Sequence, residues 1–546
     1  MHFLKLLFKK ISQLIERAEN HQIGLERWLI TFFCIIFLRN FLELFSTKTY
    51  YLSSKNYLFF FFHSAASYFF IFLAIILILY FFTKERIEKI SRLVIWGALI
   101  ILLPPIIDLI ATGGAGAIIK YRPIEQIGSV WQGIKLFFGY IFYGPFGLLY
   151  QESKSFPLAQ PEINYGIRVE VLLVFVSLIW YIFLKTKNIL KVLGGLFVTY
   201  FVFFIFGSFP YWMVLLFGAL PQADSFRGAT NLDPSFDWNK IVFFLYFIFL
   251  IVFGLVWFYV YNKEKFWAAI KNFRLIRIVN NLLFLFVGLI VALRFNSQPI
   301  VFKSFDYLFV LSACLAIIFY WLFAIFSNDI ADEKADRISS PNRPLPSGAL
   351  SVQEIKSLAL IFQIASYTCA FIVSYTFFII VFIRSCLGYL YSWFPFRLKR
   401  IPVLSSFLLA VGYWLTMLAG YLILSSNTAY SFPWQLSLIV LLGFTLAANF
   451  RDIKDFQGDK EDKTYTLLVI AGLKKGKIIV GFLGGVAFLL FPLVYQEYFK
   501  ITLIPSLAAA LAFFYLVNKK NYQEKLLFLL IFIYIILTVF LTQFFR

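Results

Sequence analysis

Long apolar runs recur from one end of the chain to the other, and they constrain its fold more than any other feature. The runs cover roughly 18–25 residues each, which is the length at which a helix crosses the hydrocarbon core of a bilayer. Hydrophobic residues make up 61% of the 546 positions and charged residues 14%, whereas about 25% of a soluble domain is charged. The sequence therefore predicts an all-α, polytopic membrane protein.

The apolar runs fall into two groups on either side of a basic segment at residues 263–277. About six runs precede this segment and about nine follow it. The earlier runs cover residues 28–45, 57–83, 93–112, 168–184, 192–208 and 240–261. The later runs cover residues 279–294, 306–327, 353–374, 376–392, 405–425, 435–450, 477–495, 501–517 and 525–543. We expect a membrane domain of unknown function over residues 1–262 and a second membrane domain over residues 263–546.

Basic loops between the apolar runs predict which side of the membrane each loop occupies. Lys and Arg collect at residues 84–92, 185–191 and 263–277, and such clusters favour the cytoplasmic side. If all three are cytoplasmic, residues 113–167 must stay on the outer side. The apolar piece at 133–150 is then expected to be re-entrant or interfacial rather than a full span.

The formal net charge of +21 and the scarcity of histidine both narrow the possible functions. No basic soluble module is available to bind nucleic acid, so the positive charge is explained by the topology of the loops, and no nucleic-acid partner is expected. The three histidines are His2, His21 and His63. A His-dependent nucleophile or a His-ligated zinc site is therefore not expected beyond His63, and we expect chemistry there to use carboxylates, Lys, Arg, Tyr and Asn.

Two acidic stretches with the same spacing each follow an apolar run in the second group. Asp329, Asp332 and Asp336 stand at positions i, i+3 and i+7, and Asn328 precedes Asp332 by four residues. On a helix, this spacing places the side chains on one face. The second stretch repeats the spacing with Asp452, Asp455 and Asp459. Because both stretches come to the cytoplasmic side when spans are counted from the basic segment, we expect them to form one divalent-metal site.

Carboxylates without His or Cys select a hard cation that prefers oxygen, such as Mg²⁺ or Mn²⁺. Mg²⁺ is usually held by a few carboxylates together with substrate phosphates, so we expect the ligand to bring phosphate oxygens. Basic side chains near the stretches can contact such oxygens; they are Arg337, Arg343, Arg397, Lys399, Arg400, Arg451 and Lys454. An isoprenoid diphosphate, with an anionic head and a long apolar tail, fits a site where apolar helices meet the cytoplasm.

Three segments, in order along the chain, resemble the signatures of the UbiA superfamily of intramembrane prenyltransferases. Residues 328–337, followed by the Pro-x-Arg-Pro-Leu-Pro-Ser-Gly run at 341–348, resemble the first aspartate-rich motif. Residues 451–460 resemble the second, and residues 391–400 resemble the short linking motif. The resemblance extends over about residues 265–546, which is roughly half of the chain.

The resemblance implies a nine-helix bundle around a central cavity, capped on the cytoplasmic side by the two aspartate-rich segments. It also implies Mg²⁺-dependent transfer of a prenyl group from a polyprenyl diphosphate to a lipid or aromatic acceptor. The implied metal–diphosphate ligands are Asn328, Asp329, Asp332 and Asp336 on one side and Asp452, Asp455 and Asp459 on the other. The implied catalytic set within them is Asp329, Asp332, Asp455 and Asp459. The side chains implied to touch the diphosphate are Arg343, Lys399, Arg400 and Lys454.

Two alternatives to prenyl transfer remain open. One keeps the fold but transfers a phosphoribosyl group from phosphoribosyl diphosphate to a polyprenyl phosphate. The other is a non-enzymatic protein that binds or transports lipid. In each case we expect an integral protein of the cell inner membrane, surrounded by membrane lipids, with its functional site facing the cytoplasm.

Overall fold

The computed structural model describes residues 2–46, 54–112, 165–207, 234–295, 306–424, 429–461 and 464–544. Within these ranges the chain is helical and contains no strand. Fourteen helices there are long and apolar enough to cross a membrane. The prediction of an all-α, polytopic membrane protein is therefore confirmed. The expected outer segment at 113–167, with its re-entrant piece at 133–150, lies outside the described residues up to position 164.

The helices divide into two compact units, and the first comprises residues 1–222 and 231–263. Its helices cover the six apolar runs predicted for the first half of the chain. They are α1 (His2–Asn20), α2 (Leu25–Ser46), α3 (Ser54–Thr83), α4 (Ile87–Gly97), the 3-10 helix η1 (Ala98–Leu102), α5 (Leu103–Thr112), α7 (Tyr165–Thr186), α8 (Ile189–Gly207) and α10 (Pro234–Tyr261). Five of the fourteen candidate spans lie in this unit.

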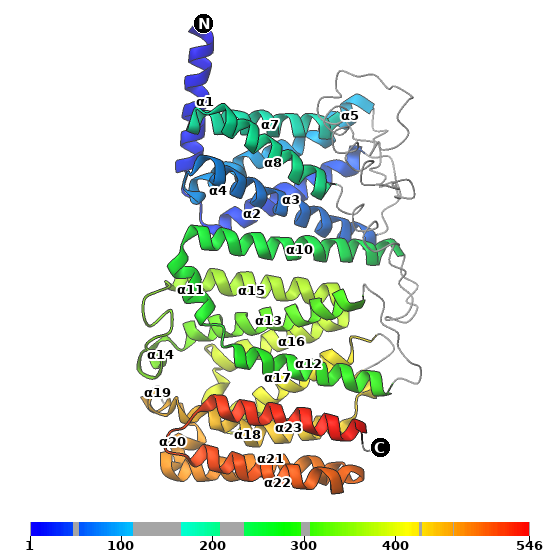
Figure 1. The fold of residues 1–546 in the computed structure, drawn as a ribbon, viewed down its shortest axis with the longest axis vertical. Helices are drawn as coiled ribbons and strands as arrows, with labels where there is room; N and C mark the ends of the chain where they lie inside the picture. Colours follow the sequence, from blue (N-terminus) through cyan, green and yellow to red (C-terminus); the bar gives the residue numbers. More distant parts are fainter. Residues whose placement is uncertain are drawn as a thin grey trace. The chain divides into compact units, whose positions relative to one another are not determined.

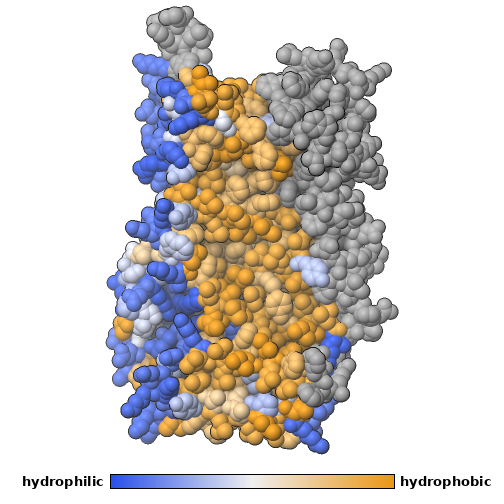
Figure 2. Space-filling view, in the orientation of Figure 1, coloured by the Kyte–Doolittle hydropathy of each residue, from blue (hydrophilic) through white to orange (hydrophobic). Residues whose placement is uncertain are grey.

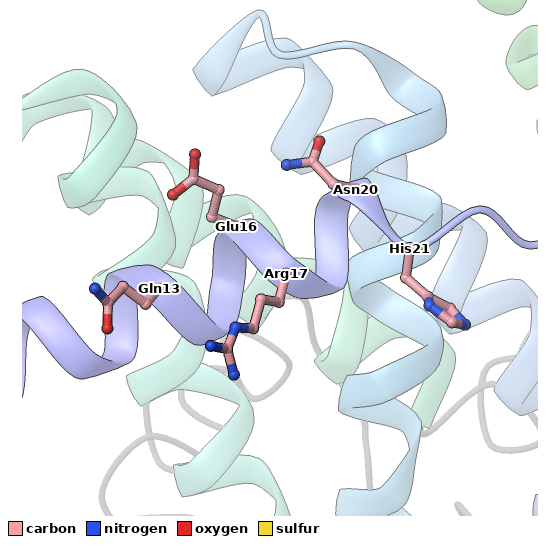
Figure 3. Close-up of a pocket in the computed structure, with 5 residues that line it drawn as sticks. All are labelled: Gln13, Glu16, Arg17, Asn20 and His21. Carbon is pink, nitrogen blue, oxygen red and sulfur yellow. The ribbon is translucent and has the colours of Figure 1, made fainter.

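The ion pairs of unit 1, one of which lies within α2, and a surface pocket include no predicted site residue. In α2, the guanidinium of Arg39 pairs with Glu43 one turn later at 2.6 Å. Such pairing reduces the cost of placing charges within an apolar helix. Figure 3 shows the pocket, which is lined by side chains of α1 and the residue that follows it. The lining residues are Gln13, Glu16, Arg17, Asn20 and His21.

Unit 2 contains the other nine candidate spans, which confirms the predicted nine-helix bundle. Its long helices are α12 (Leu275–Phe295), α13 (Asp306–Ala331), α15 (Val352–Val373), α16 (Tyr375–Ser392), α17 (Leu404–Tyr421), α18 (Trp434–Ala447) with the 3-10 helix η5 (Ala448–Ile453), α21 (Leu473–Val494), α22 (Phe499–Asn518) and α23 (Glu524–Phe544). The shorter helices are α11 (Lys263–Lys271), α14 (Glu333–Ser339), η3 (Leu398–Arg400), η4 (Ala429–Ser431), α19 (Phe456–Glu461), α20 (Leu467–Ala471) and η6 (Gln496–Tyr498).

Glycines let α12 and α17 pack with their backbones in contact. A Cβ on Gly288 would lie 1.9 Å from the carbonyl oxygen of Met417, and a Cβ on Gly420 would lie 2.0 Å from that of Leu285. Small residues permit this approach between membrane helices, whose association relies on close packing rather than on a hydrophobic difference from lipid. The contact makes α12 and α17 direct neighbours inside the bundle.

Both acidic stretches lie at the same end of unit 2, where α14 and α19 are found (Figure 1). Gly458 allows α19 to approach α14, because a Cβ at this position would lie 3.0 Å from the carbonyl oxygen of Ala335. Figure 2 shows hydrophilic atoms gathered at this end of the unit, next to an apolar face. The fold therefore brings together two acidic stretches that are far apart in sequence.

Candidate active site

The first acidic stretch does not form the single helical face that its spacing predicts. α13 ends at Ala331, and Asp332 adopts φ −106° and ψ 10° before α14 begins at Glu333. Asp329 therefore belongs to one helix and Asp336 to the next. The break turns successive carboxylates toward different partners.

Asp329 is almost fully buried, with 1% of its surface exposed, and it is held by the segment between α11 and α12. Its two carboxylate oxygens accept hydrogen bonds of 2.7 Å from Asn272 and from Arg274. The guanidinium of Arg343 lies 3.5 Å from the same carboxylate and also pairs with Asp336. Arg343 thus links two carboxylates of the first stretch across the helix break.

Asp332 contacts basic residues of the linking motif (residues 391–400), which lie after the end of α16. Lys399 in η3 forms an ion pair with Asp332, and Arg397 lies 3.3 Å from the same carboxylate. Asn328 donates a hydrogen bond of 2.9 Å to Asp332 and accepts one of 2.8 Å from Ser392 at the end of α16. The linking motif and the first acidic stretch therefore form one connected polar group.

The second acidic stretch folds around the transition from η5 to α19. Asp452 lies in η5, Asp455 lies between the two helices, and Asp459 lies within α19. The backbone N–H of Asp459 donates to the carbonyl of Asp455 at 2.8 Å. The Oδ1 atom of Asp455 is buried and has no hydrogen-bond partner among the described residues. An unsatisfied buried oxygen is costly, and such an atom is a candidate for an absent ligand.

The carboxylates of the two stretches act on one another electrostatically. Burial, followed by repulsion from Asp452 and Asp455, raises the pKa of Asp459 to about 8. The charge of Lys399 opposes this rise, and the carboxylate of Asp332 adds to it. Asp332 belongs to the first stretch and Asp459 to the second. The raised pKa therefore reflects burial first, and negative charge from both stretches adds to it.

These residues fit a hard divalent cation that also binds phosphate. The available donors are carboxylate and amide oxygens, and a cation would relieve both the unpaired oxygen of Asp455 and the repulsion around Asp459. Burial also raises the pKa of Asp336 to about 6, against the opposing charge of Arg343. No three His, Cys, Asp or Glu side chains within the described ranges are grouped as a complete metal site. Substrate phosphates and water would therefore supply the remaining ligands, as is usual for Mg²⁺.

Two of the predicted basic side chains form their ion pairs with glutamates rather than with the predicted aspartate ligands. Arg337 is exposed and pairs with Glu333 on its own helix at 2.8 Å. Lys454 pairs instead with Glu524 of α23 at 2.8 Å. Arg400 is half-buried in η3. Glu333 and Glu524, rather than the predicted aspartate ligands, therefore orient Arg337 and Lys454.

Three polar residues that contact the predicted ligands were missed by sequence reasoning. Asn272 and Arg274 bind Asp329, but they lie in the basic segment that was interpreted as a signal of topology. Ser392 binds Asn328; it lies within the linking motif at 391–400, but only the basic residues of that motif were expected to form the site. The available signal was the position of each residue, immediately before or after a membrane span.

Comparison with known proteins identifies the chain. The sequence profile of the UbiA prenyltransferase family matches residues 281–536. The digeranylgeranylglyceryl phosphate synthase of Methanococcoides burtonii is 30% identical over 247 residues, which cover 43% of this chain and 84% of that protein. The chain belongs to the UbiA prenyltransferase family. The predicted resemblance of its C-terminal half is thereby confirmed.

Other relatives carry related names. The homogentisate phytyltransferase of Synechocystis sp. is 28% identical over 170 residues, covering 30% of this chain and 55% of that protein. A solved UbiA homolog from Archaeoglobus fulgidus, bound to GPP and Mg²⁺, is 19% identical with a TM-score of 0.40, and covers 50% of this chain and 99% of that one. This UbiA family member is a prenyltransferase and an integral membrane protein.

Proposed function

We propose that unit 2 transfers a prenyl group from a polyprenyl diphosphate to a lipid or aromatic acceptor and releases diphosphate, with Mg²⁺ as its cofactor and Mn²⁺ as a possible substitute. The main support is that the two acidic stretches, which are far apart in sequence, lie together at one end of unit 2 (Figure 1), where Asp332 adds to the raised pKa of Asp459. Close packing at Gly458 holds the two stretches together. The names of the relatives, a glyceryl phosphate prenyl synthase and a phytyltransferase, support the same reaction class.

In this proposal the acidic side chains hold the metal–diphosphate group and the nearby cations bind its free oxygens. The principal ligands are Asp329, Asp332, Asp455 and Asp459, completed by Asn328, Asp336 and Asp452. When bound, Mg²⁺ supplies positive charge that stabilises the diphosphate as a leaving group. Arg343, Arg397 and Lys399 already neutralise carboxylates of the first stretch. They are therefore placed to exchange part of this pairing for phosphate oxygens.

The reaction breaks the C–O bond between the allylic carbon and the diphosphate, and the bonding electrons leave with the diphosphate. A nucleophilic atom of the acceptor forms the new bond to that carbon and loses its proton. Apolar helices around the site limit capture of the allylic cation by water. Aromatic rings inside the bundle, including the mutually contacting Phe284, Tyr413 and Phe444, can stabilise the positive charge.

We also propose the organisation and placement of the chain. Residues 263–546 form the prenyltransferase domain, and residues 1–262 form a separate membrane domain of unknown function. Basic loops at 84–92, 185–191 and 263–277 favour a cytoplasmic position for the active site under the positive-inside rule. The protein is then an inner-membrane enzyme whose metal site opens to the cytoplasm.

Release of diphosphate by the purified full-length protein tests the reaction. Radiolabelled geranylgeranyl diphosphate, Mg²⁺ and a total lipid extract are the substrates, and the double variant Asp332→Asn/Asp455→Asn is the inactive form. We expect Mg²⁺-dependent release and a labelled lipid product from the wild type, and loss of both from the double variant. Lys356→Gln, an exposed change on α15, is the matched control and keeps wild-type activity. Equal release by the wild type and the double variant would refute the proposal.

A further inference from the structure

Arg384, an arginine inside the bundle of unit 2, pairs with no carboxylate among the residues that the structure describes. Arg384, in the middle of α16, is 5% exposed. Its Nη2 donates to Asn281 at 2.5 Å, and its guanidinium stacks over the ring of Tyr320 at 4.3 Å. Its Nε and Nη1 atoms are buried without a hydrogen-bond partner among the described residues. The N–H groups on these two atoms therefore lack an acceptor.

The surroundings of Arg384 are polar but uncharged. The ionisable side chains that act on it electrostatically, within the part of the chain that the structure describes, are the phenols of Tyr320 and Tyr413. Asn280 donates to the hydroxyl of Tyr413 at 3.2 Å, while its own Oδ1 is buried and unpaired. Arg384 thus has free hydrogen-bond donors and Asn280 a free acceptor, and Tyr413 interacts with both residues. A buried charge within a membrane span is costly unless it is paired, and such residues commonly mark ligand pathways.

The cluster around Arg384 lies further along α16 from the acidic stretches and is not part of them. Arg384 precedes Ser392 by eight residues on α16, which corresponds to about 12 Å along the helix axis. Ser392 contacts Asn328 of the first acidic stretch. Tyr413 acts electrostatically on both Arg384 and Arg451, and Arg451 adjoins the second acidic stretch. Arg384 is therefore connected to the first stretch along α16 and to the second stretch through the electrostatic influence of Tyr413.

We propose that Arg384 binds a compact oxyanion, a phosphate monoester or a carboxylate, carried by the prenyl acceptor. This inference rests on the proposed function, in which the donor diphosphate occupies the acidic stretches and its tail is apolar. The acceptor is then the substrate that can bring a second anion into the bundle. Free N–H groups of Arg384 would donate to the oxyanion, and Asn280 would accept from a hydroxyl of the same molecule. Acceptors without an anionic group are poor substrates on this account.

Matched pairs of acceptors test the inference with the full-length protein. One pair is a prenylglyceryl phosphate and its dephosphorylated alcohol, and the other is a hydroxybenzoate and its methyl ester. We expect the wild type to prefer the anionic member of one pair, and that pair identifies the source of the oxyanion. Arg384→Gln should raise the KM for this anion about ten- to hundredfold, the effect of losing charge-assisted hydrogen bonds. The KM for the prenyl diphosphate should stay unchanged, and Arg384→Lys should retain part of the preference.

Controls separate this inference from folding defects and from the proposed function. Arg294→Gln removes an arginine of unit 2 that donates to Tyr498, and it should leave the anion preference intact. If Arg384→Gln does not fold, the test uses Arg384→Lys. The measured quantity is then the ratio of kcat/KM for the anionic acceptor to kcat/KM for its neutral partner. The inference is overturned if the wild type uses neutral acceptors equally well, or if the Arg384 variants keep the full preference. Absence of diphosphate release by the wild type with every acceptor and with lipid extract overturns the proposed function itself.

Discussion

Packing at Gly458 gives the sharpest prediction about how the two acidic stretches are held together. A Cβ on Gly458 would lie 3.0 Å from the carbonyl oxygen of Ala335 and 3.3 Å from the Cβ of Ser339. Gly458→Ala therefore pushes α19 from α14 by a few tenths of an ångström, and Gly458→Val pushes it further. Displacements approaching 1 Å cost about a hundredfold in rate. We expect losses of about tenfold for the Ala variant and about a hundredfold for the Val variant.

Stability should change less than activity in these variants. Replacing Gly by Ala within a helix stabilises it by up to about 1 kcal/mol, which offsets much of the 1–3 kcal/mol that overpacking typically costs. The assay is Mg²⁺-dependent diphosphate release, measured beside thermal unfolding. Gly443→Ala on α18 is the matched control, because its Cβ would meet atoms at ordinary distances of 3.7 and 3.8 Å. Wild-type activity in Gly458→Val would refute the idea that close packing of α14 and α19 aligns the site.

Two further predictions concern charge. Glu524→Gln leaves Arg277 and Lys454 without their shared carboxylate, so the free energy of unfolding should fall by about 3 kcal/mol. The control is Glu333→Gln, which removes the exposed ion pair with Arg337. This control should lower the free energy of unfolding by less than about 1 kcal/mol in the same thermal unfolding assay. The second prediction follows from the pKa of about 8 at Asp459, which lies above the ordinary value near 4. The folded, metal-free protein then binds more protons than the unfolded chain, so its stability should fall as pH rises from about 5 to 8. Added Mg²⁺ should stabilise the protein increasingly over this range, and a pH-independent Mg²⁺ effect on the unfolding temperature would contradict the assignment.

The nine spans of unit 2 and the meeting of its acidic stretches could be predicted from the sequence. Span length and apolarity are local properties, so the runs themselves indicate where helices occur. Counting spans from the basic segment at 263–277 places both stretches on one side. The contact at Gly458 then brings α14 and α19 together. The shared side of the membrane follows from periodicity and topology, whereas the contact at Gly458 is visible only in the structure.

Side-chain partners within the site could not be predicted in the same way. The spacing of Asp329, Asp332 and Asp336 predicts one shared face only if the helix is continuous. In the structure the helix is interrupted at Asp332, between α13 and α14. Lys454 has a suitable position for a diphosphate contact, yet Glu524, on a helix much later in the chain, pairs with it. Local patterns carry no information about such long-range pairs. They also cannot show that Arg384, one of many Lys and Arg residues in the chain, is buried with two guanidinium nitrogens that find no hydrogen-bond partner among the described residues.

A double-mutant cycle between Asp332 and Asp459 tests the central claim, that two separate stretches form one metal–diphosphate site. The affinity for geranylgeranyl diphosphate with Mg²⁺ is measured for the wild type, Asp332→Asn, Asp459→Asn and the double variant. If both carboxylates hold the same group, the second substitution costs much less than it does alone, and the interaction energy exceeds about 1 kcal/mol. Additive effects, within about 0.5 kcal/mol, would show two independent sites and contradict the account.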